Sequence, residues 1–122
     1  MLAYTREERI WERARASDPY RKNVLCDIED MHIGDLIVLV EPIIQPKTES
    51  IFPIISVERD QVYTIKEKRA QPDGLSLKSC FIIAVDRGLN PVPGSEKEIP
   101  LGRKVISLQD KIPLSFSLVG MA

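Results

Sequence analysis

The chain has 122 residues, of which 43% are hydrophobic and 29% are charged. This size and composition are typical of one folded domain with its own core, and we expect residues 1–122 to form a single domain. The formal net charge of −1 gives no positive field for a polyanion, so a nucleic-acid partner is not favoured. The longest apolar run, LIVLV, is too short to span a membrane, and the N-terminus lacks the order of a signal peptide. We therefore expect a cytoplasmic protein without a membrane partner, in the host cytoplasm if the chain is viral.

Residues 1–20 are expected to contain an N-terminal helix. Thr5 and Glu8 have the spacing of a capping box, in which the hydroxyl accepts from the Glu8 amide. The segment 6–16 has no glycine or proline, and Pro19 ends the helix by restricting the residue before it. Ile10, Trp11 and Ala14 form a narrow apolar stripe, which predicts that the helix packs on the outside of the fold.

Residues 23–119 show the pattern of short strands separated by turns. The residues Pro72-Asp73-Gly74 strongly favour a tight turn and predict a β-hairpin. The segment 86–102 is rich in glycine and proline and predicts a long surface loop. The expected strands are 23–28, 36–41, 51–57, 61–68, 75–85, 104–108 and 114–119. With so few helices for parallel crossovers, this pattern predicts a mainly β fold, a small antiparallel β-barrel of six or seven strands with an N-terminal α-helix.

Two stretches resemble a known group of folds. MHIGDLIVLV, from Met31 to Val40, is similar to the entry of Src-homology-3-like small barrels, where Gly-Asp precedes an apolar strand. VYTIKEKRAQPDGLSLKS, from Val62 to Ser79, resembles a hairpin of small phage and prophage proteins. The resemblance covers about a quarter of the chain. It implies a Src-homology-3-like (SH3-like) barrel and a phage or prophage origin, and it carries over no catalytic residue.

The stretch CDIEDMHIGD, from Cys26 to Asp35, is the densest in reactive side chains. Asp27, Glu29 and Asp35 could hold a magnesium ion for phosphoryl transfer, which gives the chain an enzymatic alternative. The favoured interpretation is architectural: Asp27 and Glu29 form the solvent face of a strand. We expect no catalytic residue, metal or cofactor, and we expect Cys26 and Cys80 to be reduced core thiols.

The function favoured by the sequence is that of a non-catalytic binding protein that occupies a site on a host protein or for a small ligand. Aromatic and arginine side chains most often carry interface energy. The candidate binding residues are Arg6, Arg9, Trp11, Arg13, Tyr63, Arg87 and Arg103. A further alternative is a sponge that sequesters an anionic nucleotide, with Arg87 and Arg103 clamping its phosphates in an oligomeric pocket.

The apolar ends of the sheet leave the oligomeric state open. The C-terminal LSFSLVGMA and the proline-containing IFPIISV are both strand-like and hydrophobic. An exposed strand of this kind favours pairing with a second copy, giving a homo-oligomer. Alternatively, the C-terminal strand closes the barrel.

Overall fold

The structure is a computed structural model, and it describes residues 4–20, 24–43, 54–70, 72–74 and 77–114. In these ranges the chain forms one α-helix and seven strands. This agrees with the expected mainly β fold with an N-terminal helix. The helix is α1 (Arg6–Arg15), and the strands are β1 (Leu25–Asp27), β2 (Asp35–Ile43), β3 (Ile54–Val57), β4 (Val62–Ala70), β5 (Leu77–Val85), β6 (Lys97–Pro100) and β7 (Lys104–Lys111).

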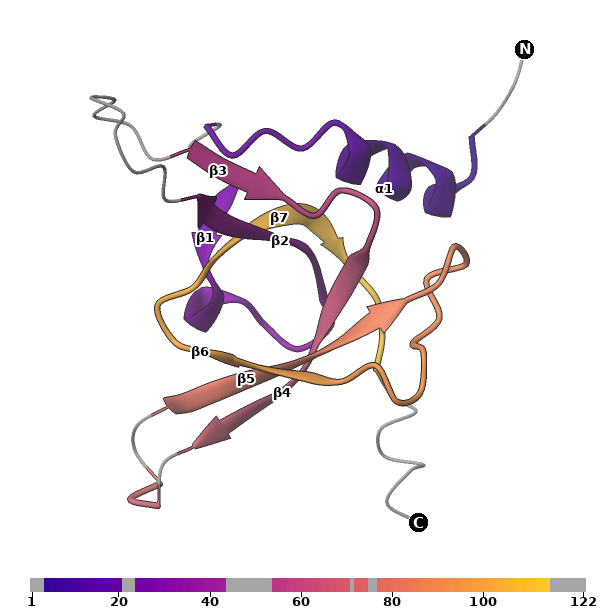
Figure 1. Cartoon of the computed structure of the whole chain (residues 1–122). Helices are drawn as coiled ribbons and strands as arrows, with labels where there is room; N and C mark the ends of the chain where they lie inside the picture. The colour runs from indigo at the N-terminus through magenta and orange to yellow at the C-terminus, as the bar shows by residue number, and fades with distance from the viewer. Residues whose placement is uncertain (1–3, 21–23, 44–53, 71, 75–76, 115–122) are drawn as a thin grey trace.

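The strands form one antiparallel sheet in the order β1-β7-β2-β4-β5-β6. The first half of β2 pairs with β4, and its second half pairs with β3. β3 and β4 are therefore one interrupted strand, broken by a turn at 58–61. The sheet curls strongly (Figure 1), but β1 and β6 are not paired with each other within the described ranges. The mainly β, antiparallel part of the expectation is confirmed.

Both faces of the sheet carry a hydrophobic core. Residues 36–40 of β2, LIVLV, are all buried, because alternate side chains enter different cores. Leu36, Val38 and Val40 join the core under α1, whereas Ile37 and Leu39 join the core on the concave face. A strand that is buried on both faces has a continuous run of apolar residues in its sequence. This is why LIVLV shows no alternation of apolar and polar residues.

Helix α1 packs on the outside of the curled sheet, as expected from its narrow stripe (Figure 1). Thr5 is the N-cap, and its Oγ1 accepts from the Glu8 amide at 3.1 Å, so the predicted helix start is confirmed. The Glu8 Oε1 accepts from the Thr5 hydroxyl at 3.1 Å, whereas a full capping box would have it accept from the Thr5 amide. Ile10, Trp11 and Ala14 are buried against the sheet. Each large apolar side chain buried in this way contributes roughly 1.5–3 kcal/mol of transfer free energy. No helix in the described part of the chain is long and apolar enough to cross a membrane.

A short 3-10 turn, η1 (Ile28–Asp30), packs Ile28 and nearby Met31 into the concave core. The Ile28 carbonyl lies 3.9 Å from the Cys80 Sγ on β5, and the Lys68 Nζ on β4 donates to the Glu29 carbonyl at 3.1 Å. The segment that follows β1 thus reaches the opposite half of the sheet.

Several expected boundaries differ from the structure. The expected strand 23–28 ends at Asp27, because residues 28–30 turn to place Ile28 in the core. The segment 86–102 is not all loop: residues 97–100 form β6, which pairs with β5 and buries Ile99. The expected strand 114–119 lies outside the described residues except for Leu114, which is buried and not in a strand.

Candidate functional site

The carboxylates of CDIEDMHIGD have different partners in the structure. Asp27 forms an ion pair with Lys104, and this contact raises the pKa of the Lys104 amine. Asp35 accepts from the His32 backbone amide at 2.8 Å, which stabilises the turn before β2. Glu29 is exposed on η1. In the described ranges, no group of three or more histidine, cysteine, aspartate or glutamate side chains is placed to hold a metal ion.

The two thiols are free, as expected of core cysteines. Cys80 is buried in the concave core, and Cys26 is half-buried at its edge. Burial raises the pKa of both thiols, and at Cys26 the nearby Asp30 and Asp27 carboxylates raise the pKa further. Both therefore remain protonated, weak nucleophiles near neutral pH.

Two of the helix arginines proposed for binding are used within the fold. Arg6 Nη2 lies 2.7 Å from Asp110 Oδ1 and also donates to the Lys111 carbonyl. Arg13 Nη1 donates to the Leu108 carbonyl at 3.0 Å. Both contacts attach α1 to β7. Arg9 is exposed on the same helix, without a side-chain partner among the described residues.

Trp11 and Arg87, far apart in the sequence, are brought together. The Arg87 guanidinium lies over the Trp11 ring, with Cζ 4.0 Å from the ring centroid. They belong to a shallow hollow of about 190 Å³ where α1 meets the β5–β6 connection. Its lining residues are Tyr4, Glu8, Trp11, Glu12, Arg15 and Arg87.

The turn that carries Arg87 is held from both sides. Asp86 Oδ1 accepts from the amides of Gly88 and Asn90, each at 2.9 Å. Leu89 adopts a φ of 64° and is only 5% exposed, packed in the same core as Trp11. These contacts hold the backbone on both sides of Arg87, and the contact with the Trp11 ring positions its guanidinium.

A second polar cluster lies on the concave face around Tyr63. The Tyr63 ring is buried, and its hydroxyl donates to Glu58 Oε1 at 3.1 Å and accepts from Lys97 Nζ at 3.0 Å. Burial raises the pKa of Tyr63, and the hydrogen bond from Lys97 offsets this only in part. The same hydrogen bond raises the pKa of Lys97, so the pair is a neutral phenol with an ammonium donor.

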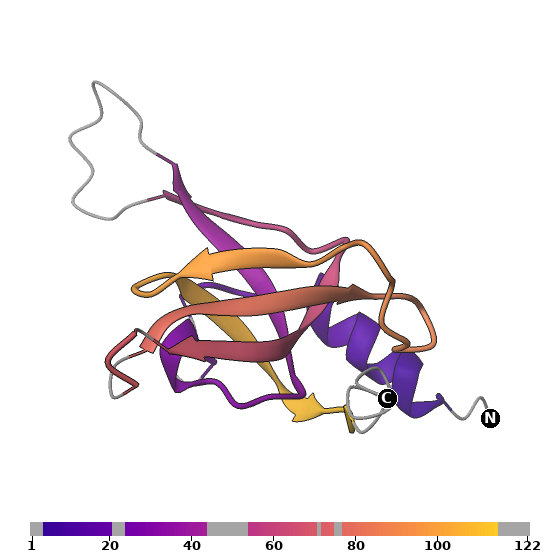
Figure 2. The same ribbon diagram turned by 90° about the horizontal axis from the view of Figure 1, so that it is seen from below.

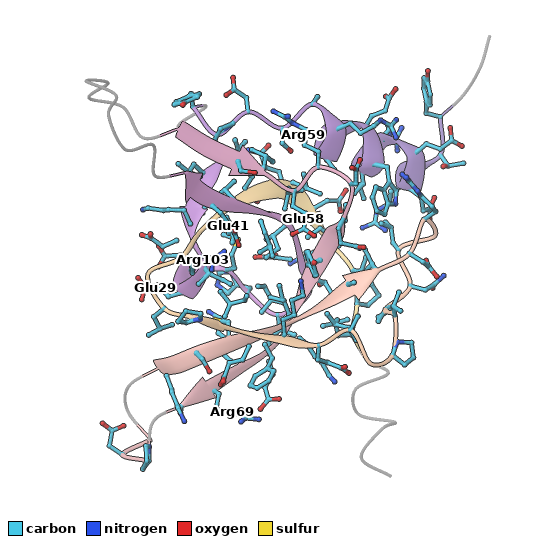
Figure 3. All side chains as sticks on the ribbon, viewed as in Figure 1. Glu29, Glu41, Glu58, Arg59, Arg69 and Arg103 are labelled. Carbon is cyan, nitrogen blue, oxygen red and sulfur yellow. The ribbon has the colours of Figure 1, made fainter. Side chains whose placement is uncertain are left out.

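Arg103 lies beside this cluster and donates to the Val40 carbonyl and to Glu41 Oε1, both at 3.4 Å. Figure 3 shows Arg103, Glu41 and Glu58 together over the space enclosed by the strands. A hollow of about 260 Å³ lined by Leu39, Glu41, Ser56 and Glu58 opens there. Arg103 thus belongs to the concave face and Arg87 to the α1 side, so one chain does not place both in a single phosphate clamp.

Sequence reasoning missed several residues of these sites, among them Tyr4, Glu58 and Lys97. Tyr4 lies before the helix cap and is 53% exposed, although it lines the hollow beside Trp11. Glu58 lies in the break between β3 and β4, and Lys97 lies in the segment expected to be loop. The roles of Glu58 and Lys97 depend on strand pairing between distant segments, for which the local sequence holds no signal.

The comparisons with known proteins give no relative. No family model matches the chain, and no curated protein or solved structure matches it.

Proposed function

We propose that the chain is a non-catalytic binding protein that docks on a protein partner through the surface formed by α1 and the turn 86–90. The observation that carries this proposal is the stacking of Arg87 on Trp11 in a hollow that Tyr4 also lines. Tryptophan, tyrosine and arginine are the side chains most enriched in interface hot spots. Here an exposed tyrosine and an exposed arginine lie around a buried tryptophan.

The charges of the hollow favour a protein over a nucleic acid. Arg15 and Arg87 line it together with Glu8 and Glu12, so its formal charges cancel. A nucleic-acid surface depends on an excess of cations over the phosphate path, and acidic side chains at the same place oppose it. A protein surface of mixed polarity has no such requirement.

Site-directed photo-crosslinking tests this proposal. A photoreactive phenylalanine analogue is placed at position 4 in one version of the chain and at position 78 in a control version. Lys78 is exposed on the β4–β5 hairpin, whose tip lies at the opposite end of the sheet from α1 (Figure 2). We expect a protein in host lysate that crosslinks at position 4 and not at position 78, and that is lost when Arg87→Ala is added. The same crosslinked proteins at both positions, or none at position 4, would contradict the proposal.

We further propose that the curled sheet is a small barrel of the SH3-like kind, of phage or prophage type. The concave hydrophobic core and the contacts of η1 with β4 and β5 support a ring-like arrangement. Nuclear Overhauser contacts between the amides of β1 and β6 test whether the ring closes through strand pairing. Homo-oligomerisation remains a prediction, and a mass measurement in solution tests it.

A further inference from the structure

Among the described residues, Arg69 and Arg87 each lie over an aromatic ring, but Arg69 also lies 4.0 Å from Glu67 Oε1. The guanidinium groups of Arg6, Arg13, Arg59 and Arg103 donate to acceptors within the fold. Arg87 is held instead by the face of an indole, and no described residue accepts a hydrogen bond from its guanidinium. Its planar set of N–H donors is therefore both fixed in place and unused.

We infer that Arg87 is a receptor for a carboxylate, supplied by an aspartate or glutamate side chain of the protein partner; this inference rests on the proposed function. A guanidinium presents paired donors that match the two oxygens of a carboxylate. Stacking on Trp11 and the anchors at Asp86 and Leu89 reduce the entropy lost when the ligand binds. Tyr4, which is half exposed beside the guanidinium, offers an apolar contact for the partner chain.

The surrounding charges select a carboxylate over a phosphate group. Glu8 and Glu12 line the same hollow, so a doubly charged phosphate meets two carboxylates as well as the arginines. Glu8 is held there by the Thr5 hydroxyl, which donates to its Oε1 at 3.1 Å. Because the formal charges of the hollow cancel, a doubly charged group gains little attraction to offset its larger desolvation cost, whereas a singly charged carboxylate still matches the paired donors of Arg87.

Trp11 provides a second reason to expect an acceptor at this place. Its Nε1 is buried and has no hydrogen-bond partner among the described residues. An unpaired buried donor destabilises the fold, because it has lost its hydrogen bonds to water. Trp11 lines the hollow, so this unpaired donor belongs to the same side chain that carries the Arg87 guanidinium.

The single tryptophan of the chain makes the inference directly testable by fluorescence. The intact chain is titrated with a capped glutamate peptide, with a capped glutamine peptide of equal length and with inorganic phosphate. We expect a saturable change in Trp11 emission with the glutamate peptide and no change with the glutamine peptide. Arg87→Met keeps an unbranched side chain that can cover the indole but has no donors. We expect it to bind about tenfold more weakly or worse, since a hydrogen bond to a charged group exceeds the free energy of a tenfold change.

Three results would overturn the inference: no emission change with the glutamate peptide, equal binding by Arg87→Met, or equal binding of the glutamine peptide. Tighter binding of phosphate than of the glutamate peptide would overturn the choice of carboxylate. Circular dichroism establishes that the variant is folded. If position 4 crosslinks a partner that Arg87→Met still binds with unchanged affinity, the carboxylate inference fails while the proposed function stands. If position 4 crosslinks nothing, the proposed function fails, and the peptide titration still reports on Arg87.

Discussion

Lys97 on β6 donates a hydrogen bond to the hydroxyl of Tyr63 on β4 at 3.0 Å, although β5 lies between these two strands. Adjacent strands are about 4.8 Å apart, so these two long side chains meet over the concave face of β5. The Tyr63 hydroxyl also donates to Glu58, at the break between β3 and β4. One phenol thus connects three segments of the concave face.

Tyr63→Phe removes this connection while it keeps the buried ring. We expect the free energy of unfolding to fall by about 1 kcal/mol, the net value of a hydrogen bond. Urea denaturation followed by circular dichroism measures the change. Tyr4→Phe is the matched control, because Tyr4 is exposed and no described residue bonds its hydroxyl. An equal effect of the two substitutions would show that the Tyr63 network does not stabilise the fold.

The Arg6–Asp110 contact predicts a dependence of stability on pH. Burial alone would raise the pKa of Asp110, but hydrogen bonds from Arg6 and the Lys111 amide, with the charges of Arg6 and Arg13, lower it below its ordinary value of 3.8. The ionised carboxylate therefore favours the folded state. Its contribution is present above the ordinary value and is lost as the pH falls through the lower folded-state pKa.

Asp110→Asn should remove this contribution. Both side chains are partly exposed, so we expect a loss of no more than about 1 kcal/mol at neutral pH, smaller in high salt. Unfolding experiments at a series of pH values compare the two proteins. The difference between them should shrink as the pH falls below the ordinary value, and a difference that grows on acidification would contradict the assignment.

Gly34 is required by two constraints in the turn before β2. Its φ is +95°, and a Cβ built on it would lie 2.5 Å from the Ile112 carbonyl oxygen. We expect Gly34→Ala to cost at least about 2 kcal/mol, because backbone strain and a backbone clash add. Gly94→Ala separates the two effects, since Gly94 has a φ of +84° but open space around it. Thermal unfolding should show a clearly larger loss at Gly34; equal losses would mean that the close approach is relieved without cost.

Replacing threonine by valine should affect the stability of the fold differently at two positions. Thr64 is fully buried on β4 and its Oγ1 has no described hydrogen-bond partner, so Thr64→Val should leave stability unchanged or increase it. Thr5 caps α1, so Thr5→Val should cost about 1 kcal/mol. Urea denaturation of both variants tests the pair. A large loss at Thr64 would reveal a partner for its hydroxyl.

The parts of the fold that sequence could predict depend on local rules. The capping box at Thr5, the run 36–40 and the turn 72–74 each specify their structure within a few residues, and the helix, β2 and the β4–β5 hairpin follow. β6 was missed because Lys97–Pro100 is surrounded by breakers and has one buried side chain. Its strand conformation comes from pairing with β5, which is a tertiary effect.

The sequence suggested which residue types to consider for the candidate sites, but not which residues lie together in the fold. Aromatic and arginine residues were chosen as candidates by residue type, but their burial depends on the fold. Trp11 and Tyr63 are 5% and 3% exposed, so they position Arg87 and Lys97 and do not themselves form the surface. The Arg87–Trp11 stack joins a helix to a distant turn, and neither segment alone indicates the other.

The burial of β2 on both faces has a consequence for the exchange of backbone amides with solvent deuterium. Residues 36–40 are bonded to neighbours on both edges and covered by a separate core on each side. Local opening of α1 uncovers the core on one face of β2, and local opening of η1 uncovers the core on the other face. Neither motion alone exposes the strand from both sides. The amides of this strand should therefore exchange last, at a rate set by global unfolding, and they report the stability of the whole molecule.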